Sequence, residues 1–359
     1  MTEKESLIAL TAYIPFGPAR IKLLLDYFGS AKKSWNANER DIRQIGLGEE
    51  RAIGFLRYRH HFDASEYFNR LKKLKIDVIA FNEKLYPENL KDLANSPVAL
   101  YIKGKIKLVD TSAIAIVGSR KMTSYGREVT TKFASELAGY GITIVSGLAR
   151  GIDTAAHKGA LGVGGRTIAV LGCGLDSVYP PENFRLAEEI IGSGAIISEY
   201  PLGYPAKPIN FASRNRIISG LSRAVIVVEG AEKSGTLLTA SCAAEQGRTV
   251  FAVPGQITSP LSAAPHFLLK NGARMITSTK DILEELNIQT IVNREEVERV
   301  MPSDKDEAAV LEILENESLH LDEIVRMSSL DIGKLSARLT VMELKGLIRN
   351  LGGGVYKKI

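Results

Sequence analysis

Three patterns of apolar and polar positions follow one another along the chain. Residues 1–78 carry apolar positions at helical spacing between short turns that contain glycine. Residues 79–290 carry short β-branched runs that alternate with helix-like stretches. Residues 304–359 carry three further helix patterns and then a glycine-rich turn between two strand-like runs. We therefore expect three domains with these bounds, and a polar, charged linker at 287–305 between the second and the third.

The middle domain contains seven apolar runs that predict the strands of a parallel sheet. The runs are apolar on both faces and are separated by helix-like stretches, which is the pattern of a sheet covered by helices on both sides. They are AIAIVGS (113–119), ITIVSG (142–147), TIAVLGCG (167–174), AIISEYP (195–201), AVIVVEG (224–230), TVFAVPG (249–255) and RMIT (274–277). Ligands of such sheets bind beyond the carboxyl ends of the strands, so we expect a site there.

The first domain is expected to be helical. IPFGPARIKLLLDYFGS (14–30) predicts a turn and an amphipathic helix, and IGLGEERAIGFL (45–56) repeats the arrangement. The turn at Gly17-Pro18 resembles a helix-hairpin-helix element, whose backbone N–H groups can meet a phosphate. A helical packing module without a ligand explains the same turn, because Pro and Gly between helices are ordinary turn residues.

The third domain predicts a winged helix, since three helices and a hairpin with a glycine tip make up that motif. Residues 304–359 carry 8 Lys and Arg against 10 Asp and Glu, a net charge of −2. That charge weighs against tight duplex binding, because phosphate contacts need cations. We favour a protein-contact or regulatory role. The alternative is a recognition helix that offers Lys334 and Arg338 to DNA.

The positive charge of the chain lies in its middle. The whole chain has 46 Lys and Arg against 41 Asp and Glu, a formal net charge of +5. Residues 110–280 have 17 against 12, which is also +5. A polyanion is therefore expected to dock on the middle domain.

Composition argues against several classes of protein. Cys173 and Cys242 are too few for a disulfide framework and suit a reducing cytoplasm. The five histidines show no metal-ligand spacing, so we expect neither a metal nor a cofactor. No apolar run approaches the roughly 20 residues of a bilayer span, and MTEKESLIALTAY lacks the pattern of a signal peptide. We expect a cytoplasmic protein without a membrane partner.

Glycine, hydroxyl and arginine residues collect at the predicted strand ends. Glycines there let the backbone approach a ligand, and a helix N-terminus suits an anion. The candidate phosphate- or DNA-binding residues are Ser119 and Arg120 of VGSR, Gly147, Arg150 and Gly151 of SGLARGID, Ser234, Gly235 and Thr236 of EGAEKSGTLLTA, Phe211, Arg214, Asn215 and Arg216 of FASRNR, and Lys207. Because these segments follow strands of one sheet, we expect them to converge.

The arginines of FASRNR have two interpretations. In the first, Arg214 and Arg216 flank Asn215 at the mouth of a pocket and grip phosphates, while Phe211 stacks on a base. In the second, one of them, Arg216, clamps Glu229 as a structural partner. The sequence leaves both open.

No catalytic constellation accompanies these residues, so we do not expect an enzyme. The chain lacks a G-x-S-x-G turn, a Walker lysine and a dinucleotide fingerprint. His157 follows a glycine-rich loop on an amphipathic helix, where a packed histidine is expected rather than a general base. Asp153 is expected to cap that helix. Asp176 and Glu199 form either a carboxylate pair or separate pairs with nearby arginines.

Seven motifs together resemble the DNA-processing protein A (DprA/Smf) family, in order and in spacing, over most of residues 85–277. They are YPENLKDLANSPVALYIKG, VGSR, SGLARGID, TIAVLGCGLDSVYPPEN, SEYPLG, FASRNRIISGLS and GRTVFAVPG. The resemblance implies an extended Rossmann-like core, an N-terminal helical domain of the SAM or helix-hairpin-helix type and a C-terminal winged helix. It also implies single-stranded DNA binding, homodimers and loading of the recombinase RecA in natural transformation.

The chain departs from the family pattern at Ala212, where a proline is usual, and at Ala264 and His266, where glycine and asparagine are usual. The departures at Ala264 and His266 lie near the C-terminal edge of the middle domain and leave its local loop shape or dimer geometry open. The alternative function is a nucleotide-processing hydrolase similar to the lysine-decarboxylase-like phosphoribohydrolases. Thr239 occupies the position of their catalytic glutamate, which argues against that chemistry.

Overall fold

The computed structural model describes residues 1–93, 95–288, 305–315, 317–328, 330–344 and 347–358. The chain divides into two compact units, residues 1–289 and residues 290–359. Most of the predicted linker at 287–305 lies outside the described residues.

A nine-stranded sheet forms the centre of the first unit, with the order β1-β2-β6-β5-β4-β3-β7-β8-β9. The strands are β1 Asp77–Ala80, β2 Ala99–Gly104, β3 Ile114–Val117, β4 Ile144–Ser146, β5 Thr167–Val170, β6 Ala195–Ser198, β7 Ala224–Val227, β8 Thr249–Ala252 and β9 Arg274–Met275. The seven strands from β3 to β9 pair in parallel, which confirms the predicted sheet. Each strand is shorter than its apolar run.

Strands β1 and β2 were not among the predicted strands. Both pair antiparallel, β1 with β2 and β2 with β6, so they extend one edge of the sheet. Ala99 to Ile102 are fully covered, and ALYIKG has no alternation to mark it as a strand. A short apolar run of this kind looks the same in a strand and in a buried helix, so only the pairing identifies it.

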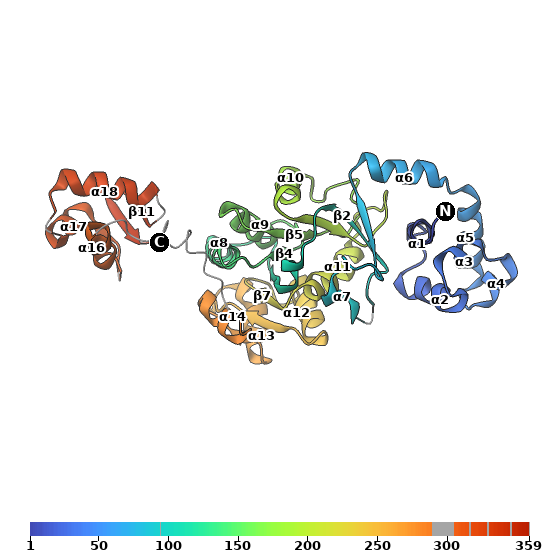
Figure 1. The fold of residues 1–359 in the computed structure, drawn as a ribbon. Helices are drawn as coiled ribbons and strands as arrows, with labels where there is room; N and C mark the ends of the chain where they lie inside the picture. The colour runs from blue at the N-terminus through green and yellow to red at the C-terminus, as the bar shows by residue number, and fades with distance from the viewer. Residues whose placement is uncertain (94, 289–304, 316, 329, 345–346, 359) are drawn as a thin grey trace. The chain divides into compact units, whose positions relative to one another are not determined.

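Helices cover both faces of the sheet (Figure 1). They are α7 Glu88–Lys91, α8 Ser124–Gly139, α9 Ile152–Gly162, α10 Phe184–Ser193, α11 Pro208–Leu221, α12 Gly235–Glu245, α13 Ala263–Lys270 and α14 Thr279–Glu285, with 3-10 turns at Leu108–Ser112, Pro181–Asn183 and Pro260–Ser262. Strand β3 shows the arrangement, since Ala115 and Val117 pack with α11 and α12 on one face. Ile114 and Ile116 pack with α8 and α9 on the other face.

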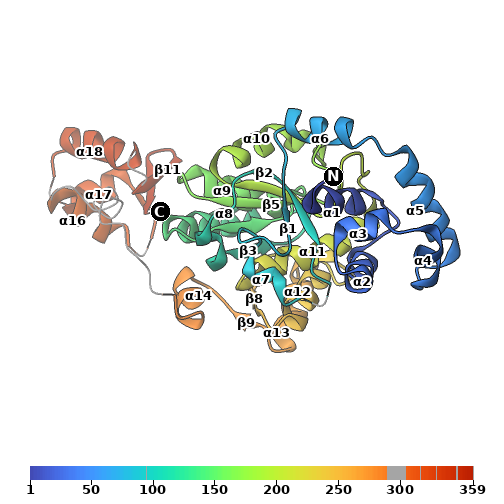
Figure 2. The ribbon, with the colours of Figure 1, turned by 45° about the vertical axis from the view of Figure 1, so that its right-hand side comes forward.

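Six helices precede the sheet and pack beside its antiparallel edge (Figure 2). They are α1 Glu3–Ala12, α2 Pro18–Phe28, α3 Ala31–Asn36, α4 Glu39–Gln44, α5 Glu49–His61 and α6 Ala64–Lys73. The predicted helices in 14–30 and 45–56 are confirmed as α2 and α5. A hydrogen bond of 3.0 Å between the hydroxyls of Thr11 and Tyr101 links α1 to β2. The N-terminal helices therefore have both a core of their own and a fixed contact with the sheet.

The second unit is a winged helix, as predicted. Its helices are α16 Lys305–Ile313, α17 Leu321–Ser328 and α18 Ile332–Leu344, and its strands are β10 Leu319–His320, β11 Ile348–Gly352 and β12 Val355–Lys358. The strands form an antiparallel sheet in the order β10-β12-β11. Gly352, Gly353 and Gly354 have φ values of 97°, 62° and 79°, so the tip of the hairpin requires residues without a side chain.

Candidate functional site

A pocket of about 450 Å³ lies beyond the carboxyl ends of the parallel strands. We call it the strand-end pocket. Its walls come from the loop after β3, the first half of α11 and the loop from β7 into α12, and they include Gly118, Ser119, Arg120, Asp153, Phe211, Arg214, Asn215, Ser234, Gly235, Thr236, Leu238 and Thr239. A smaller hollow adjoins the strand-end pocket. It shares Arg120, Phe211 and Arg214 with that pocket, and its other lining residues include Gly147, Arg150 and Tyr179. Ten of the thirteen predicted site residues therefore line one of these two cavities.

Helix N-termini border this site. Helix α12 begins at Gly235, and the hydroxyl of Ser234 caps it by accepting a hydrogen bond of 3.1 Å from the backbone N–H of Thr236. Helix α11 begins at Pro208, and Phe211 and Arg214 follow within its first two turns. The N-terminal end of a helix carries a partial positive charge, so two helices add their dipoles to the arginines of the site.

Phe211 is the aromatic centre of the site. The guanidinium carbon of Arg120 lies 5.5 Å from the centroid of its ring, and that of Arg214 lies 5.9 Å away. The ring of Tyr179 is 5.2 Å from it, centroid to centroid. The prediction included Phe211 and missed Tyr179. The aromatic residue of VYPP, placed soon after the end of β5, was the available signal.

Arg214 is buried, in contrast to the exposed Arg120. Only 3% of Arg214 is accessible, and its Nη1 donates a hydrogen bond of 2.9 Å to the backbone oxygen of Val170. Its Nε has no hydrogen-bond partner among the residues that the structure describes. The hydrogen bond to Val170 holds the end of β5 in place. Because Arg214 also lines both cavities, it adds a positive charge to their walls.

Asp153 accepts hydrogen bonds from the backbone N–H groups of Gly147 and Ala149 at 3.1 and 3.3 Å. It therefore holds the loop after β4 instead of capping α9 as expected. Burial raises the pKa of Asp153, and the nearby positive charge of Arg214 opposes that rise.

The two predicted loop glycines pack against other parts of the site. A Cβ on Gly147 would lie 1.5 Å from Nη1 of Arg214. A Cβ on Gly151 would lie 2.2 Å from the backbone oxygen of Ser119, and Gly151 has a φ of 75°. Glycine is therefore required at both positions for close packing and, at Gly151, for backbone conformation.

Arg216 does form a structural pair, but the expected partner was wrong. Its Nη2 donates to a carboxylate oxygen of Glu199, and both side chains are mostly buried. Glu229 instead accepts a hydrogen bond of 3.0 Å from the backbone N–H of Thr123. Arg216 lies on the side of α11 that faces another cavity, so it does not line the strand-end pocket.

The remaining predicted residues differ in their surroundings. The side-chain N–H of Asn215 donates to the backbone oxygen of Gly235 at 3.4 Å, which ties α11 to the start of α12. Arg150 forms an exposed ion pair with Glu182. Lys207 is exposed just before α11 and lies outside both cavities, as does Gly151.

The second interpretation of Asp176 and Glu199 is the correct one, since each meets an arginine. Asp176 lies 3.8 Å from Arg70 and accepts hydrogen bonds from the backbone N–H of Gly203. Glu199 pairs with Arg216, and burial raises its pKa while the arginine opposes that rise.

His157 is a packed residue, as expected. It is fully buried on α9, and its Nδ1 lies 2.7 Å from the hydroxyl of Thr167. Burial lowers the pKa of His157 to about 3, so the ring is neutral at physiological pH. It lies outside the residues that line the strand-end pocket.

Over the described ranges, no group of three or more His, Cys, Asp or Glu side chains is placed to hold a metal ion. None of the helices in that part of the chain is long and apolar enough to cross a bilayer. Cys173 and Cys242 are both free thiols.

The fold and the site define an α/β protein of the Rossmann-like class, with a basic, aromatic-lined pocket at the strand ends. Comparison with protein families is more specific. The chain belongs to the DNA recombination-mediator protein A family, whose model matches residues 77–287. A second model, the DprA winged helix domain, matches residues 296–354.

Curated relatives and solved structures agree with this family. Protein Smf of Escherichia coli is 39% identical over 324 residues, which cover 88% of this chain and 86% of Smf. DNA processing protein DprA of Streptococcus pneumoniae is 45% identical over 247 residues, covering 68% of this chain and 86% of DprA. A crystal structure of the pneumococcal protein matches with a TM-score of 0.68 and 35% identity, over 79% of this chain and 98% of that one. DNA processing protein A from Helicobacter pylori, studied for its single-stranded DNA binding mode, matches with a TM-score of 0.54 and 32% identity, over 59% of this chain and 96% of that one.

Proposed function

We propose that this protein binds single-stranded DNA in the strand-end pocket without chemical turnover, and that it helps to load RecA in natural transformation and recombination. The observation that carries the proposal is the placement of Arg120 over Phe211 at the edge of the pocket. A cation for the phosphate and an aromatic ring for the base, side by side, suit an unpaired strand.

Single strands are favoured over duplex DNA for a geometric reason. Phe211 is only partly exposed within the pocket, so a base must leave its stack to reach the ring. Moving a base out of a duplex costs a few kcal/mol of unstacking and unpairing free energy, and the same movement in a single strand costs much less. The single-stranded DNA binding mode of the Helicobacter pylori relative supports the same choice.

The proposed absence of turnover rests on how the polar groups of the pocket are used. The carboxylate of Asp153 already accepts two backbone hydrogen bonds, and Thr239 provides a hydroxyl where the hydrolase alternative needs a carboxylate. The two backbone bonds favour a structural role for Asp153, and Thr239 has no carboxylate to serve as a general base.

RecA loading depends on the family resemblance, and so does the homodimer, which we also propose. The net charge of −2 on residues 304–359 supports a protein partner for the winged helix rather than a phosphate backbone. In that unit Arg338, one of the two cations of the DNA-reading alternative, lies 3.6 Å from Asp306 and is therefore engaged with an acid.

Fluorescence anisotropy with one labelled sequence, presented single-stranded and as a duplex, tests the proposal. We expect clear preference for the single strand, and no release of product from nucleotides incubated with the same preparation. Preference for the duplex would favour a winged-helix DNA reader, and turnover would favour the hydrolase. RecA loading is tested separately, by whether the protein speeds RecA filament assembly on an oligonucleotide.

A further inference from the structure

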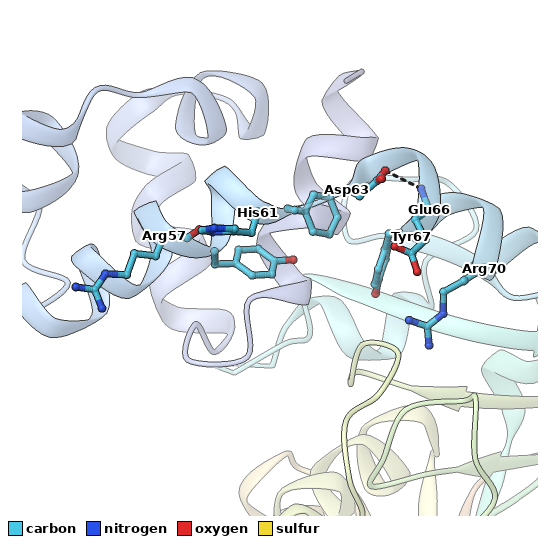
Figure 3. Close-up of a pocket in the computed structure, with 8 residues that line it drawn as sticks. Arg57, His61, Asp63, Glu66, Tyr67 and Arg70 are labelled. Atoms are coloured by element: carbon cyan, nitrogen blue, oxygen red, sulfur yellow. Dashed lines mark hydrogen bonds between the residues drawn. The ribbon is translucent and has the colours of Figure 1, made fainter.

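A second pocket, of about 380 Å³, lies on the N-terminal helices where α5 meets α6 (Figure 3). We call it the α5–α6 pocket. Its lining comes from the last turn of α5, the two residues of the bend and the first two turns of α6, namely Arg57, Tyr58, His61, Phe62, Asp63, Glu66, Tyr67 and Arg70. None of these residues lines the strand-end pocket.

Aromatic rings form the floor of this pocket. The ring centroids of Tyr58 and Phe62 are 5.3 Å apart, and those of Phe62 and Tyr67 are 5.4 Å apart. Tyr67 is fixed from behind, because its hydroxyl lies 3.2 Å from that of Tyr101 and accepts a hydrogen bond of 3.4 Å from the backbone N–H of Leu202. The floor is therefore a row of half-buried, positioned rings that present apolar surface to the cavity.

Cations occupy the rim of the pocket. Arg57 and Arg70 lie at opposite ends of the row of rings in Figure 3, and both are exposed. Arg57 has no carboxylate within 4.0 Å among the described residues. The segment 57–75 as a whole carries six Lys and Arg against two Asp and Glu. One of those acids, Asp63, caps α6 by accepting a hydrogen bond of 2.9 Å from the backbone N–H of Glu66.

A short surface loop connects this pocket to the strand-end site. Asp176 lies 3.8 Å from Arg70 of the α5–α6 pocket. Tyr179, three residues further on, has its ring 5.2 Å from that of Phe211. Three residues span at most about 11 Å even when fully extended. The rims of the two pockets therefore lie close enough for one flexible strand to reach both.

We propose that the α5–α6 pocket is a second contact for the same single strand, in which a base stacks against the aromatic floor and Arg57 holds a flanking phosphate. Aromatic rings with cations between them are the usual means of holding single-stranded nucleic acid without sequence preference. This inference rests on the proposed function, and it assigns the N-terminal helices a direct part in binding.

Two oligonucleotide lengths separate this pocket from the strand-end site. A dinucleotide carries a single phosphate between its two bases and so occupies one pocket at most, whereas an oligonucleotide of about 20 nucleotides can reach both. The variants are Arg57→Ala in the full chain and, as a matched control, Arg40→Ala, an exposed arginine on α4 that lines neither pocket. Arg120→Ala reports on the strand-end site.

We expect Arg57→Ala to lower the salt slope of binding by about 0.7 for the long oligonucleotide, because one phosphate contact is lost. The short oligonucleotide should bind the Arg57→Ala chain and the unaltered chain with the same affinity. Phe62→Leu, which keeps an apolar side chain but removes the ring, should weaken binding of the long oligonucleotide on the order of five-fold with little change in slope.

The inference is overturned if Arg57→Ala and Phe62→Leu bind the long oligonucleotide as Arg40→Ala does, while thermal melting shows all three folded. Failure of the proposed function has a different signature, in which Arg120→Ala leaves binding of both lengths unchanged. A loss confined to the long oligonucleotide in the Arg57→Ala chain supports the second contact.

Discussion

Arg120 and Arg214 both contact the ring of Phe211, but the two arginines differ in their surroundings and therefore in their roles. Arg120 is exposed and faces solvent at the edge of the pocket, whereas Arg214 is buried and bonded to the backbone of Val170. A phosphate can therefore reach Arg120 without displacing a protein contact. Arg214 contributes its charge from beneath the site and keeps the strand end in position.

Arg120→Ala should weaken binding of single-stranded DNA and lower its salt slope by about 0.7, since one phosphate contact is removed. The melting temperature should stay near that of the unaltered chain, because the side chain is exposed. Salt-titrated anisotropy and calorimetry on the same sample measure both. Unchanged affinity and slope would show that phosphates do not bind here.

Phe211→Ala should weaken binding through lost stacking, worth about 1 to 3 kcal/mol, while the salt slope stays almost constant. Phe211 is half-buried and lines both cavities, so we expect only a moderate loss of stability. Binding at several salt concentrations, with a melting curve, tests this. A large fall in melting temperature with normal affinity would make Phe211 a core residue instead.

His157 should make the unfolding free energy depend on pH. Its folded pKa is about 3 and the usual value is 6.5, so between these values the unfolded chain binds the extra proton. The contribution of His157 to the unfolding free energy is therefore fully present above pH 6.5. It decreases as the pH drops, and at pH 5 it is smaller by about 2 kcal/mol.

Urea unfolding of the unaltered chain and of His157→Gln, at pH 7.5 and pH 5, isolates this contribution. The variant should lose less stability between the two pH values than the unaltered chain. Equal losses in both would mean that His157 does not remain neutral in the folded protein.

Helix α11 presents two faces to two different surroundings. Phe211, Arg214 and Asn215 face the strand-end pocket, while Ser213 and Arg216 face a separate cavity beside the N-terminal helices. Helical spacing therefore places Arg214 and Arg216 on different faces of α11, so FASRNR contributes both to the strand-end pocket and to a structural ion pair.

Arg216→Ala should destabilise the fold by about 3 kcal/mol, because it leaves the buried carboxylate of Glu199 without its cation. Affinity of the folded fraction for single strands should change little. Chemical unfolding measures the loss, and the double variant Arg216→Ala with Glu199→Gln should recover part of it. A stable Arg216→Ala chain that no longer binds DNA would contradict the assignment of this pair to structure.

The division of the chain into two compact units also has a consequence for binding. The strand-end pocket, the α5–α6 pocket and the basic segment 110–280 all belong to residues 1–289. The unit that follows carries its own apolar core, which includes Leu335 and Leu339 of α18.

A chain that ends at residue 289 should therefore remain folded and keep its affinity for single strands. Circular dichroism and anisotropy, compared with the full chain, provide the measurement. If the shortened protein is folded but no longer binds, the winged helix is the DNA reader and the strand-end assignment fails.

The local pattern of apolar and polar residues in the sequence determined much of the secondary structure of this protein. β-branched runs between helix-like stretches predicted seven parallel strands, because a strand covered on both faces must be apolar throughout. Gly, Ser and Arg at the ends of those runs also predicted where the strand-end pocket lies, since parallel strands bring their carboxyl ends to one edge. The three helices and hairpin of the winged helix followed in the same way.

Tertiary structure decided which side chains meet. The sequence could not show that Arg216 pairs with Glu199 rather than Glu229, because the two carboxylates follow different strands and only the sheet order places one beside α11. It could not reveal Tyr179 beside Phe211, which comes from a loop 32 positions away along the chain. Strand ends are fixed by local preference, whereas contacts between distant segments depend on how the whole sheet is assembled.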